Sequence, residues 1–205
     1  MSALTVGIAG LIAVAAITPG PNNLVVMRAA AQAGVIGALP AIAGILAGGL
    51  TMLALAMAGA GMLFAHEPRL YLAIAIGGGA YLCWLGTRLV LDSFAALPVQ
   101  AAAPALPTGT AALFAFQFLN PKSWVMVLTV TAAVQGADSA HRWWLTAALF
   151  TVIPALCLAL WSLLGASMAG ALHRPAVRDW VDRILGLLLV ASALLLVFTA
   201  KDLPA

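Results

Sequence analysis

Residues 17–24 read ITPGPNNL and interrupt a long run that has no charged side chain. Pro19 and Pro21 lack the amide hydrogen that a helix interior requires. A helix through them would therefore leave the carbonyls of Ala15 and Ile17 without donors. In hydrocarbon each such carbonyl costs several kcal/mol, so the segment must lie against protein or a wet cavity. The pattern predicts a broken membrane helix and, with it, an α-helical membrane fold.

The residues that follow suit the start of a second half-helix. Gly20 can cap it, and Pro21 fits its first position, where no amide hydrogen is needed. Asn22 and Asn23 then offer amide donors and acceptors beside the break. We predict a substrate-binding role for this whole stretch: Thr18, Pro19, Gly20, Pro21, Asn22 and Asn23.

A second break is predicted at residues 120–123, which read NPKS. Pro121 removes the hydrogen bond to the Gln117 carbonyl and biases the preceding residue away from helical geometry. Asn120 is a favourable N-cap, with Pro121 again at the first helical position. Asn120, Pro121 and Lys122 complete the predicted substrate-binding set. The alternative is that both breaks are structural proline kinks without a ligand.

Lys122 is the most informative residue, because the second break places it in the first turn of a half-helix at membrane depth. A cation there opposes the positive end of the helix dipole. A central Lys also costs about 2.5–3.5 kcal/mol on insertion scales. A bound carboxylate would relieve both penalties, and so would loss of the proton. If the fourth span begins later, Lys122 instead reaches an interface.

Composition supports the membrane interpretation. Of 205 residues, 64% are hydrophobic and 7% are charged, whereas about 25% of a typical soluble domain is charged. Six spans are predicted, at roughly 3–27, 37–64, 70–90, 111–134, 144–170 and 184–200, each near the length that crosses a bilayer. We predict one transporter domain over 1–205, with three-helix halves at 1–91 and 111–205. The Pro-containing segment 92–110 is the predicted linker.

An odd number of spans in each half predicts that the second half is inverted relative to the first. Many secondary transporters are built in this way, with the binding site where broken helices meet near the midplane. The basic residues give a modest bias for orientation. Five of them follow the first, third and fifth spans, against three on the other side, so both termini are predicted outside.

Three segments resemble motifs of the LysE/RhtB family of amino-acid exporters: ITPGPNNL at 17–24, GAYLCWLG at 79–86 and FQFLNPK at 116–122. The resemblance covers essentially the whole chain and extends to members that export cysteine and O-acetylserine or homoserine and threonine. It implies a multi-pass protein of the bacterial inner (plasma) membrane that exports small amino acids along an ion gradient. That function follows from the resemblance and not from composition or spacing.

The six acidic residues all lie at predicted span ends, in loops or in the tail. Without an intramembrane carboxylate to pair with extra positive charge, a neutral amino acid is the favoured substrate. Protons are the favoured coupling ion, exchanged at Lys122 as the substrate carboxylate binds and leaves. We predict no catalytic residue, metal ligand, cofactor or nucleic-acid partner. A homodimer is compatible, since six short spans enclose a cavity poorly. The alternatives are a channel, an exporter of another small solute or a metal ion, and a membrane-embedded enzyme.

Overall fold

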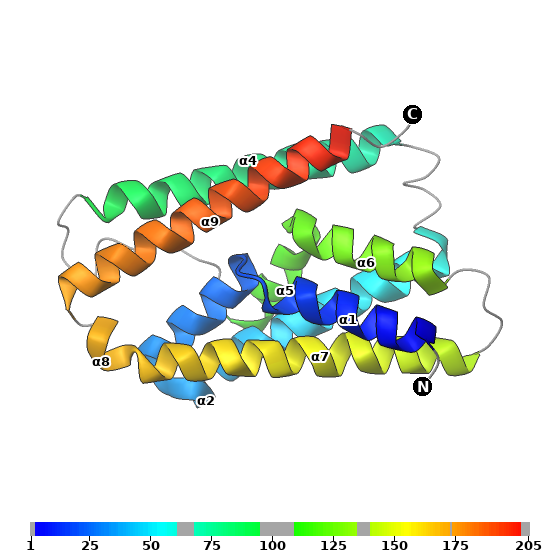
Figure 1. Cartoon of the computed structure of the whole chain (residues 1–205), viewed down its shortest axis with the longest axis horizontal. Helices are drawn as coiled ribbons and strands as arrows, with labels where there is room; N and C mark the ends of the chain where they lie inside the picture. The colour runs from blue at the N-terminus through cyan, green and yellow to red at the C-terminus, as the bar shows by residue number, and fades with distance from the viewer. Residues whose placement is uncertain (1–2, 61–67, 95–108, 135–139, 173, 202–205) are drawn as a thin grey trace.

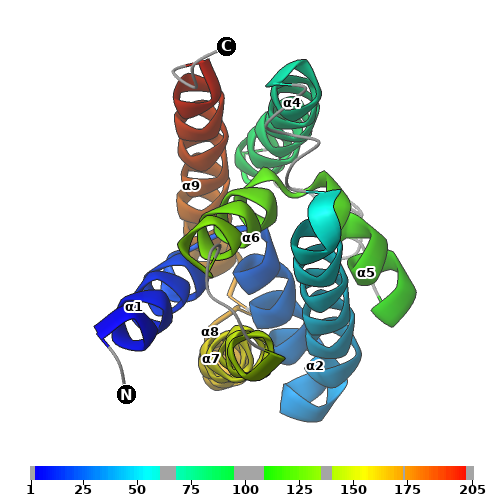
Figure 2. The ribbon, with the colours of Figure 1, turned by 90° about the vertical axis from the view of Figure 1, so that its right-hand side faces the viewer.

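The computed structural model describes residues 3–60, 68–94, 109–134, 140–172 and 174–201, and every regular element within them is helical. The predicted linker lies almost wholly outside the described residues. The long helices run roughly along one axis of the molecule (Figure 1). Viewed down that axis, α4 and α9 form a pair on one side, while α1, α2, α5 and α7 surround α6 on the other (Figure 2).

The first helix, α1 (Ala3–Ile17), is separated by the first break from α2 (Pro21–Leu55). At Gly34 the backbone of α2 leaves helical geometry with φ of 71°, a conformation that glycine adopts without steric cost. The chain turns back there, so that α2 has two arms, 21–33 and 35–55 (Figure 1). The arms bury a shared cluster that includes Val26 and Ile42. A short π-helix, Ala56–Ala60, continues the second arm.

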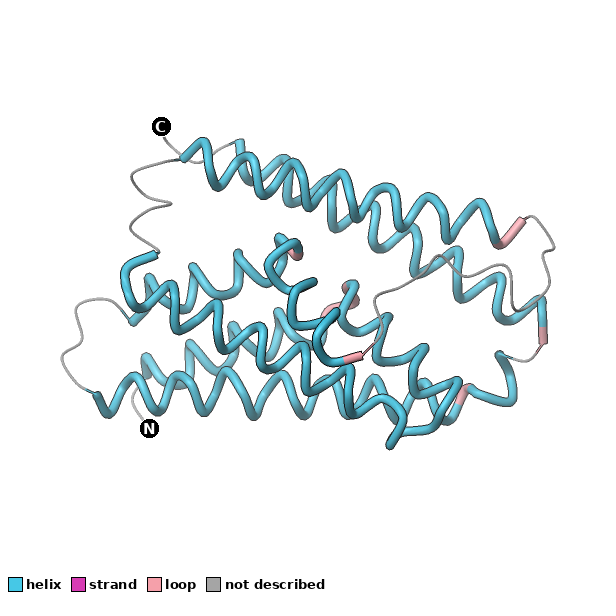
Figure 3. Tube along the Cα trace, turned by 180° about the vertical axis from the view of Figure 1, so that it is seen from behind, coloured by secondary structure: helices cyan, strands magenta, loops and turns pink. Residues whose placement is uncertain are grey.

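The second break separates α5 (Thr110–Leu119) from α6 (Pro121–Val134). Seen from behind, the short non-helical stretches of the two breaks lie near the middle of the long axis (Figure 3). Gly44 and Gly48 of α2 let α5 approach closely. A Cβ at Gly44 would lie 2.3 Å from the Thr110 carbonyl oxygen, and one at Gly48 would lie 2.6 Å from Cγ of Gln117. Gly44 and Gly48 therefore form a helix-packing face.

The remaining helices are α4 (Pro68–Asp92), α7 (Ala140–Ser167), the single turn α8 (Ala169–Leu172) and α9 (Pro175–Lys201). Helices α4 and α9 touch through Gly86 and Gly186, where a Cβ on either glycine would lie within 2.6 Å of the other's carbonyl oxygen. Gly165 lets α7 approach the backbone of Met27 in the same way.

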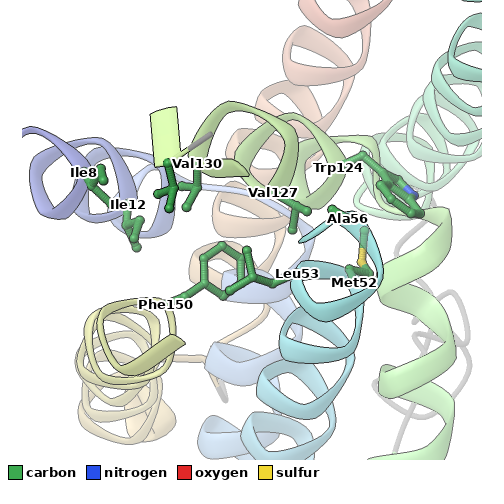
Figure 4. Close-up of a cluster of buried hydrophobic side chains, with 10 residues drawn as sticks. Ile8, Ile12, Met52, Leu53, Ala56, Trp124, Val127, Val130 and Phe150 are labelled. Carbon is green, nitrogen blue, oxygen red and sulfur yellow. The ribbon is translucent and has the colours of Figure 1, made fainter. Parts of the chain in front are cut away.

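A buried cluster joins four helices around the two breaks. Ile12 of α1, Leu53 of α2, Val127 of α6 and Phe150 of α7 all point into it (Figure 4). Full burial of such side chains contributes about 1.5–3 kcal/mol each. The half-helices on either side of the breaks are therefore fixed by apolar packing, although the backbone at each break cannot form helical hydrogen bonds.

Two helical stretches, Pro21–Gly59 and Trp143–Ser167, are long and apolar enough to cross a membrane by length and composition. Shorter apolar helices cover Leu4–Ile17, Thr110–Leu119 and Lys122–Val134. Thr110–Leu119 and Lys122–Val134 lie within the predicted fourth span, and Leu4–Ile17 lies within the predicted first span. Helix α9 begins at Pro175, before the predicted last span at 184–200.

Candidate substrate site at the two helix breaks

The first break leaves the final carbonyls of α1 without helical donors, and side chains supply the missing hydrogen bonds. The Thr18 hydroxyl shares its hydrogen between the Val14 and Ala15 carbonyls, at 2.7 and 3.0 Å, and the Val14 carbonyl also accepts from the Thr18 amide at 3.3 Å. Asn23 Nδ2 donates to the Ala16 carbonyl at 3.1 Å. The indole of Trp161, on α7, donates to the Ile17 carbonyl at 3.3 Å. These bonds satisfy the end of α1 inside an apolar bundle.

On the other side of this break, α2 starts as the sequence predicts. Gly20 is the N-cap and Pro21 is the first helical residue. The backbone of Gly20 is extended, with φ of −167°, so any residue could adopt it. Space is limited there, because a Cβ would lie 3.2 Å from Nζ of Lys122 and 3.3 Å from its Cδ, so the lysine side chain would have to shift.

The second break is shorter than the first and consists of one non-helical residue. Asn120 leaves helical geometry, with φ of −88° and ψ of 104°, and its Oδ1 accepts a hydrogen bond from the Lys122 amide at 3.1 Å. This confirms Asn120 as the N-cap of α6. Pro121 is the first residue of α6, and Lys122 lies in its first turn.

Lys122 crosses from the second break to the first. Its Nζ donates to the Thr18 carbonyl at 2.7 Å, to the Thr18 hydroxyl at 3.1 Å and to the Pro19 carbonyl at 3.5 Å. The carbonyl end of α1 carries the negative end of that helix dipole. The neighbouring break therefore provides partners for the ammonium, a stabilisation that the sequence alone did not indicate.

A cluster of amides lies beside this contact. Asn22 and Gln117 form a reciprocal pair, in which each side-chain nitrogen donates to the other's oxygen at 3.0 Å. Asn120 Nδ2 also donates to Asn22 Oδ1, at 3.4 Å, and the Ser123 hydroxyl donates to Gln117 Oε1, at 2.8 Å. Gln117 is 1% exposed, so this network fixes polar groups that could not be left unpaired.

Gln117 and Ser123 were not among the predicted site residues. A signal for Gln117 was present, because it is the one polar side chain between Ala111 and Leu119. Ser123 had no comparable signal, since a serine in a helix usually bonds to its own backbone.

An open cavity of about 60 Å³ lies between the breaks, the second arm of α2 and α7. Its polar side is formed by Asn22, Asn23, Gln117, Asn120, Lys122 and Ser123. Its other walls are apolar and include Ile45, Met126, Phe150 and Pro154. Among the described residues that line this cavity, Lys122 is the one with a charged side chain.

The structure thus brings eight of the nine predicted residues to one place. Six of them line the cavity: Gly20, Pro21, Asn22, Asn23, Asn120 and Lys122. Thr18 and Pro19 adjoin it through Lys122. Of Pro121 only the backbone position at the start of α6 is described. A pocket with mostly apolar walls and a few convergent polar groups is typical of small-molecule sites.

Residues 13–200 match the LysE type translocator family. The chain belongs to this family. The predicted family resemblance, and with it the assignment to membrane transport proteins, is thereby confirmed.

This translocator has named relatives of similar length. It is 29% identical to the cysteine/O-acetylserine efflux protein of Salmonella paratyphi A over 88% of this chain and 90% of that protein. It is also 29% identical to the threonine efflux protein of Salmonella typhi, over 70% of this chain and 76% of the relative. The threonine efflux protein of Escherichia coli K12 is 30% identical over 44% of each chain. No solved structure matches the chain.

Proposed function

We propose that this LysE family translocator exports small, neutral amino acids across the bacterial inner membrane, with the cavity between the two breaks as its substrate site. The cysteine/O-acetylserine or homoserine/threonine type of substrate is supported by the relatives' names. The size of the cavity and its mostly apolar walls suit an amino acid with a small, uncharged side chain.

The observation that carries this proposal is the position of Lys122. Its ammonium lies at the cavity with hydrogen bonds only to a hydroxyl and two carbonyls. A substrate carboxylate is a stronger partner for an ammonium than any of these. The α2 and α6 half-helices also begin at the cavity, through Pro21 and Asn120. Their positive ends favour an anionic group in the same place.

Lys122 further supports coupling to protons. We propose that it takes up a proton as the substrate carboxylate arrives and gives it up after release on the outside. In the empty site its partners are uncharged, so the protonated form gains most when the carboxylate is present. This would let a site without an acidic side chain exchange a substrate for a proton.

The architecture in the proposal is two inverted halves of three spans. It is supported by one break in each half and by the reciprocal pair that Asn22 and Gln117 form between them. Such halves can rock around a fixed central site.

The proposed orientation in the membrane, with both termini outside, is tested by Ala176→Cys. On the proposed orientation, a reagent that cannot cross the membrane labels this cysteine in inverted vesicles and fails to label it in intact cells.

The function is tested by counterflow in proteoliposomes, using a panel of labelled amino acids. We expect saturable counterflow of small neutral amino acids, accelerated by a proton gradient, and little counterflow of lysine or arginine. Flux that never saturates would indicate a channel. Absence of counterflow for every neutral amino acid would overturn the proposal.

A further inference from the structure

The acceptors at the cavity are unequally occupied. Asn22 Oδ1 accepts from Gln117 and Asn120, so both its lone pairs are used. Gln117 Oε1 accepts from Asn22 and from Ser123 and is equally full. Asn120 Oδ1 accepts from the Lys122 amide. Asn23 Oδ1 accepts no hydrogen bond within the described part of the chain.

The orientation of the Asn23 amide is fixed by its surroundings. Its Nδ2 group donates to the Ala16 carbonyl at 3.1 Å and to the Thr18 carbonyl at 2.8 Å. Carbonyl oxygens only accept, so the nitrogen must face them and the oxygen must face away. A flipped amide would place three oxygens together and remove the Asn23 donor from both carbonyls.

The Asn23 oxygen is not sealed in the packing. Asn23 is 4% exposed and lines the cavity. Among the described residues, its oxygen is not one of the fully buried atoms that lack a partner. A buried residue that keeps an open, unused acceptor in a binding cavity is suited to a donor from the ligand.

The amide group that carries this acceptor lies next to the Lys122 ammonium. Asn23 Nδ2 and Lys122 Nζ donate to the same Thr18 oxygen, at 2.8 and 2.7 Å. One carbonyl of the broken helix therefore holds a cation and an amide as neighbours. An α-amino acid carries its carboxylate and its ammonium on one carbon. Its site therefore needs a cation for the carboxylate and a hydrogen-bond acceptor for the ammonium, close to each other.

We infer that Asn23 Oδ1 binds the α-ammonium group of the substrate while Lys122 binds its carboxylate, so that Asn23 selects amino acids against other small carboxylates. This inference rests on the proposed function and adds the specificity-determining residue. An amide oxygen suits an ammonium because it accepts without adding a charge, which would be costly at this depth. A hydrogen bond to a charged group is worth about 10- to 100-fold in affinity.

The test compares amino acids with their analogues that lack the amine. Binding to the purified protein in detergent is measured for L-threonine against 3-hydroxybutanoate and for L-cysteine against 3-mercaptopropanoate. We expect the wild type to prefer each amino acid at least 10-fold. In Asn23→Ala the ratio of the affinity for the amino acid to that for its analogue should fall close to one, mainly because the amino acid binds more weakly.

Asn22→Ala is the matched control, because the Asn22 oxygen is already filled by protein donors. We expect Asn22→Ala to weaken the binding of both ligands of a pair without changing the ratio of their affinities. An unchanged preference in Asn23→Ala would overturn the inference. If Asn23→Ala does not fold, the wild type alone tests the inference. Equal affinity of the wild type for an amino acid and for its analogue without the amine would overturn the inference. Absence of binding for all four ligands would count against the proposed function itself.

Discussion

The two helix breaks have the same predicted role and opposite chemistry. The first break leaves three residues, 18–20, outside the flanking helices and presents carbonyl oxygens. The second leaves a single residue, Asn120, and presents a cation and amide donors. Each break supplies hydrogen-bonding groups that the other uses, and this helps to stabilise both inside an apolar bundle. A substitution in one break is therefore expected to affect the other break as well.

The largest effect is expected at Lys122, the one charged link between the breaks. Lys122→Met keeps much of the length but removes the charge and the donors, so substrate affinity should fall by at least about 100-fold, as for loss of a charge-assisted contact. Isothermal titration in detergent with L-threonine and L-cysteine measures this loss. Wild-type affinity in the Met variant would eliminate the carboxylate role.

Lys122→Arg separates binding from coupling. Arginine keeps a positive charge but does not titrate in any physiological range. We expect substrate binding to persist at reduced affinity, while the pH dependence of counterflow disappears. Counterflow at several internal pH values in proteoliposomes checks this. An Arg variant with full proton coupling would transfer the coupling role to another group.

The next largest effect is expected at Gly20, where the breaks approach most closely. In Gly20→Leu the new side chain would occupy the place of Lys122, since even its Cβ would lie 3.2 Å from Nζ. Export should be abolished while the protein remains inserted and abundant, as shown by counterflow and by the amount of protein in the membrane. Gly10→Leu is the matched control, because nothing lies within 4 Å of a Cβ there. Unchanged transport in Gly20→Leu would reduce the break to a structural kink.

A moderate effect is expected from the amide pair that connects the breaks. Asn22→Ala and Gln117→Ala should each lower the free energy of unfolding by about 1–3 kcal/mol, because each leaves a partner unsatisfied. The double variant should cost less than the two single losses added together, since neither partner is then left alone. Thermal unfolding in detergent gives all four values. Strict additivity would mean that the reciprocal hydrogen bonds do not couple the breaks.

Local rules in the sequence predicted the breaks well. Proline placement gave the start of both half-helices, and Asn120 is the N-cap that its residue type suggests. The rules could not reveal that Lys122 reaches Thr18, because 104 residues separate them and only packing of the bundle joins them. The same holds for the pairing of Asn22 with Gln117, 95 residues apart.

The start of α9 shows a different limit. Charged residues near 178–183 indicated a connection, whereas the structure places them on the helix. Several of these charged side chains have partners there. Asp182 pairs with Arg28 of α2, and Arg183 donates to the Ser93 hydroxyl at 3.0 Å while its guanidinium stacks over Phe94. Pro175 at the first helical position was the local signal for the true start.

The smallest effect is expected at Trp161, which supports the first break from outside the pair. Its indole donates to the Ile17 carbonyl at 3.3 Å, a long hydrogen bond from a residue on α7. Trp161→Phe keeps an aromatic ring but loses the donor, so the free energy of unfolding should fall by about 0.5–1.5 kcal/mol. Substrate affinity should change by less than about threefold, because Lys122 and Asn23 still hold the Thr18 carbonyl. Thermal unfolding and titration of the same preparation measure both quantities. A large loss of affinity with little loss of stability would show that α7 positions the substrate, and the first break could then no longer be treated as a site organised by the second break alone.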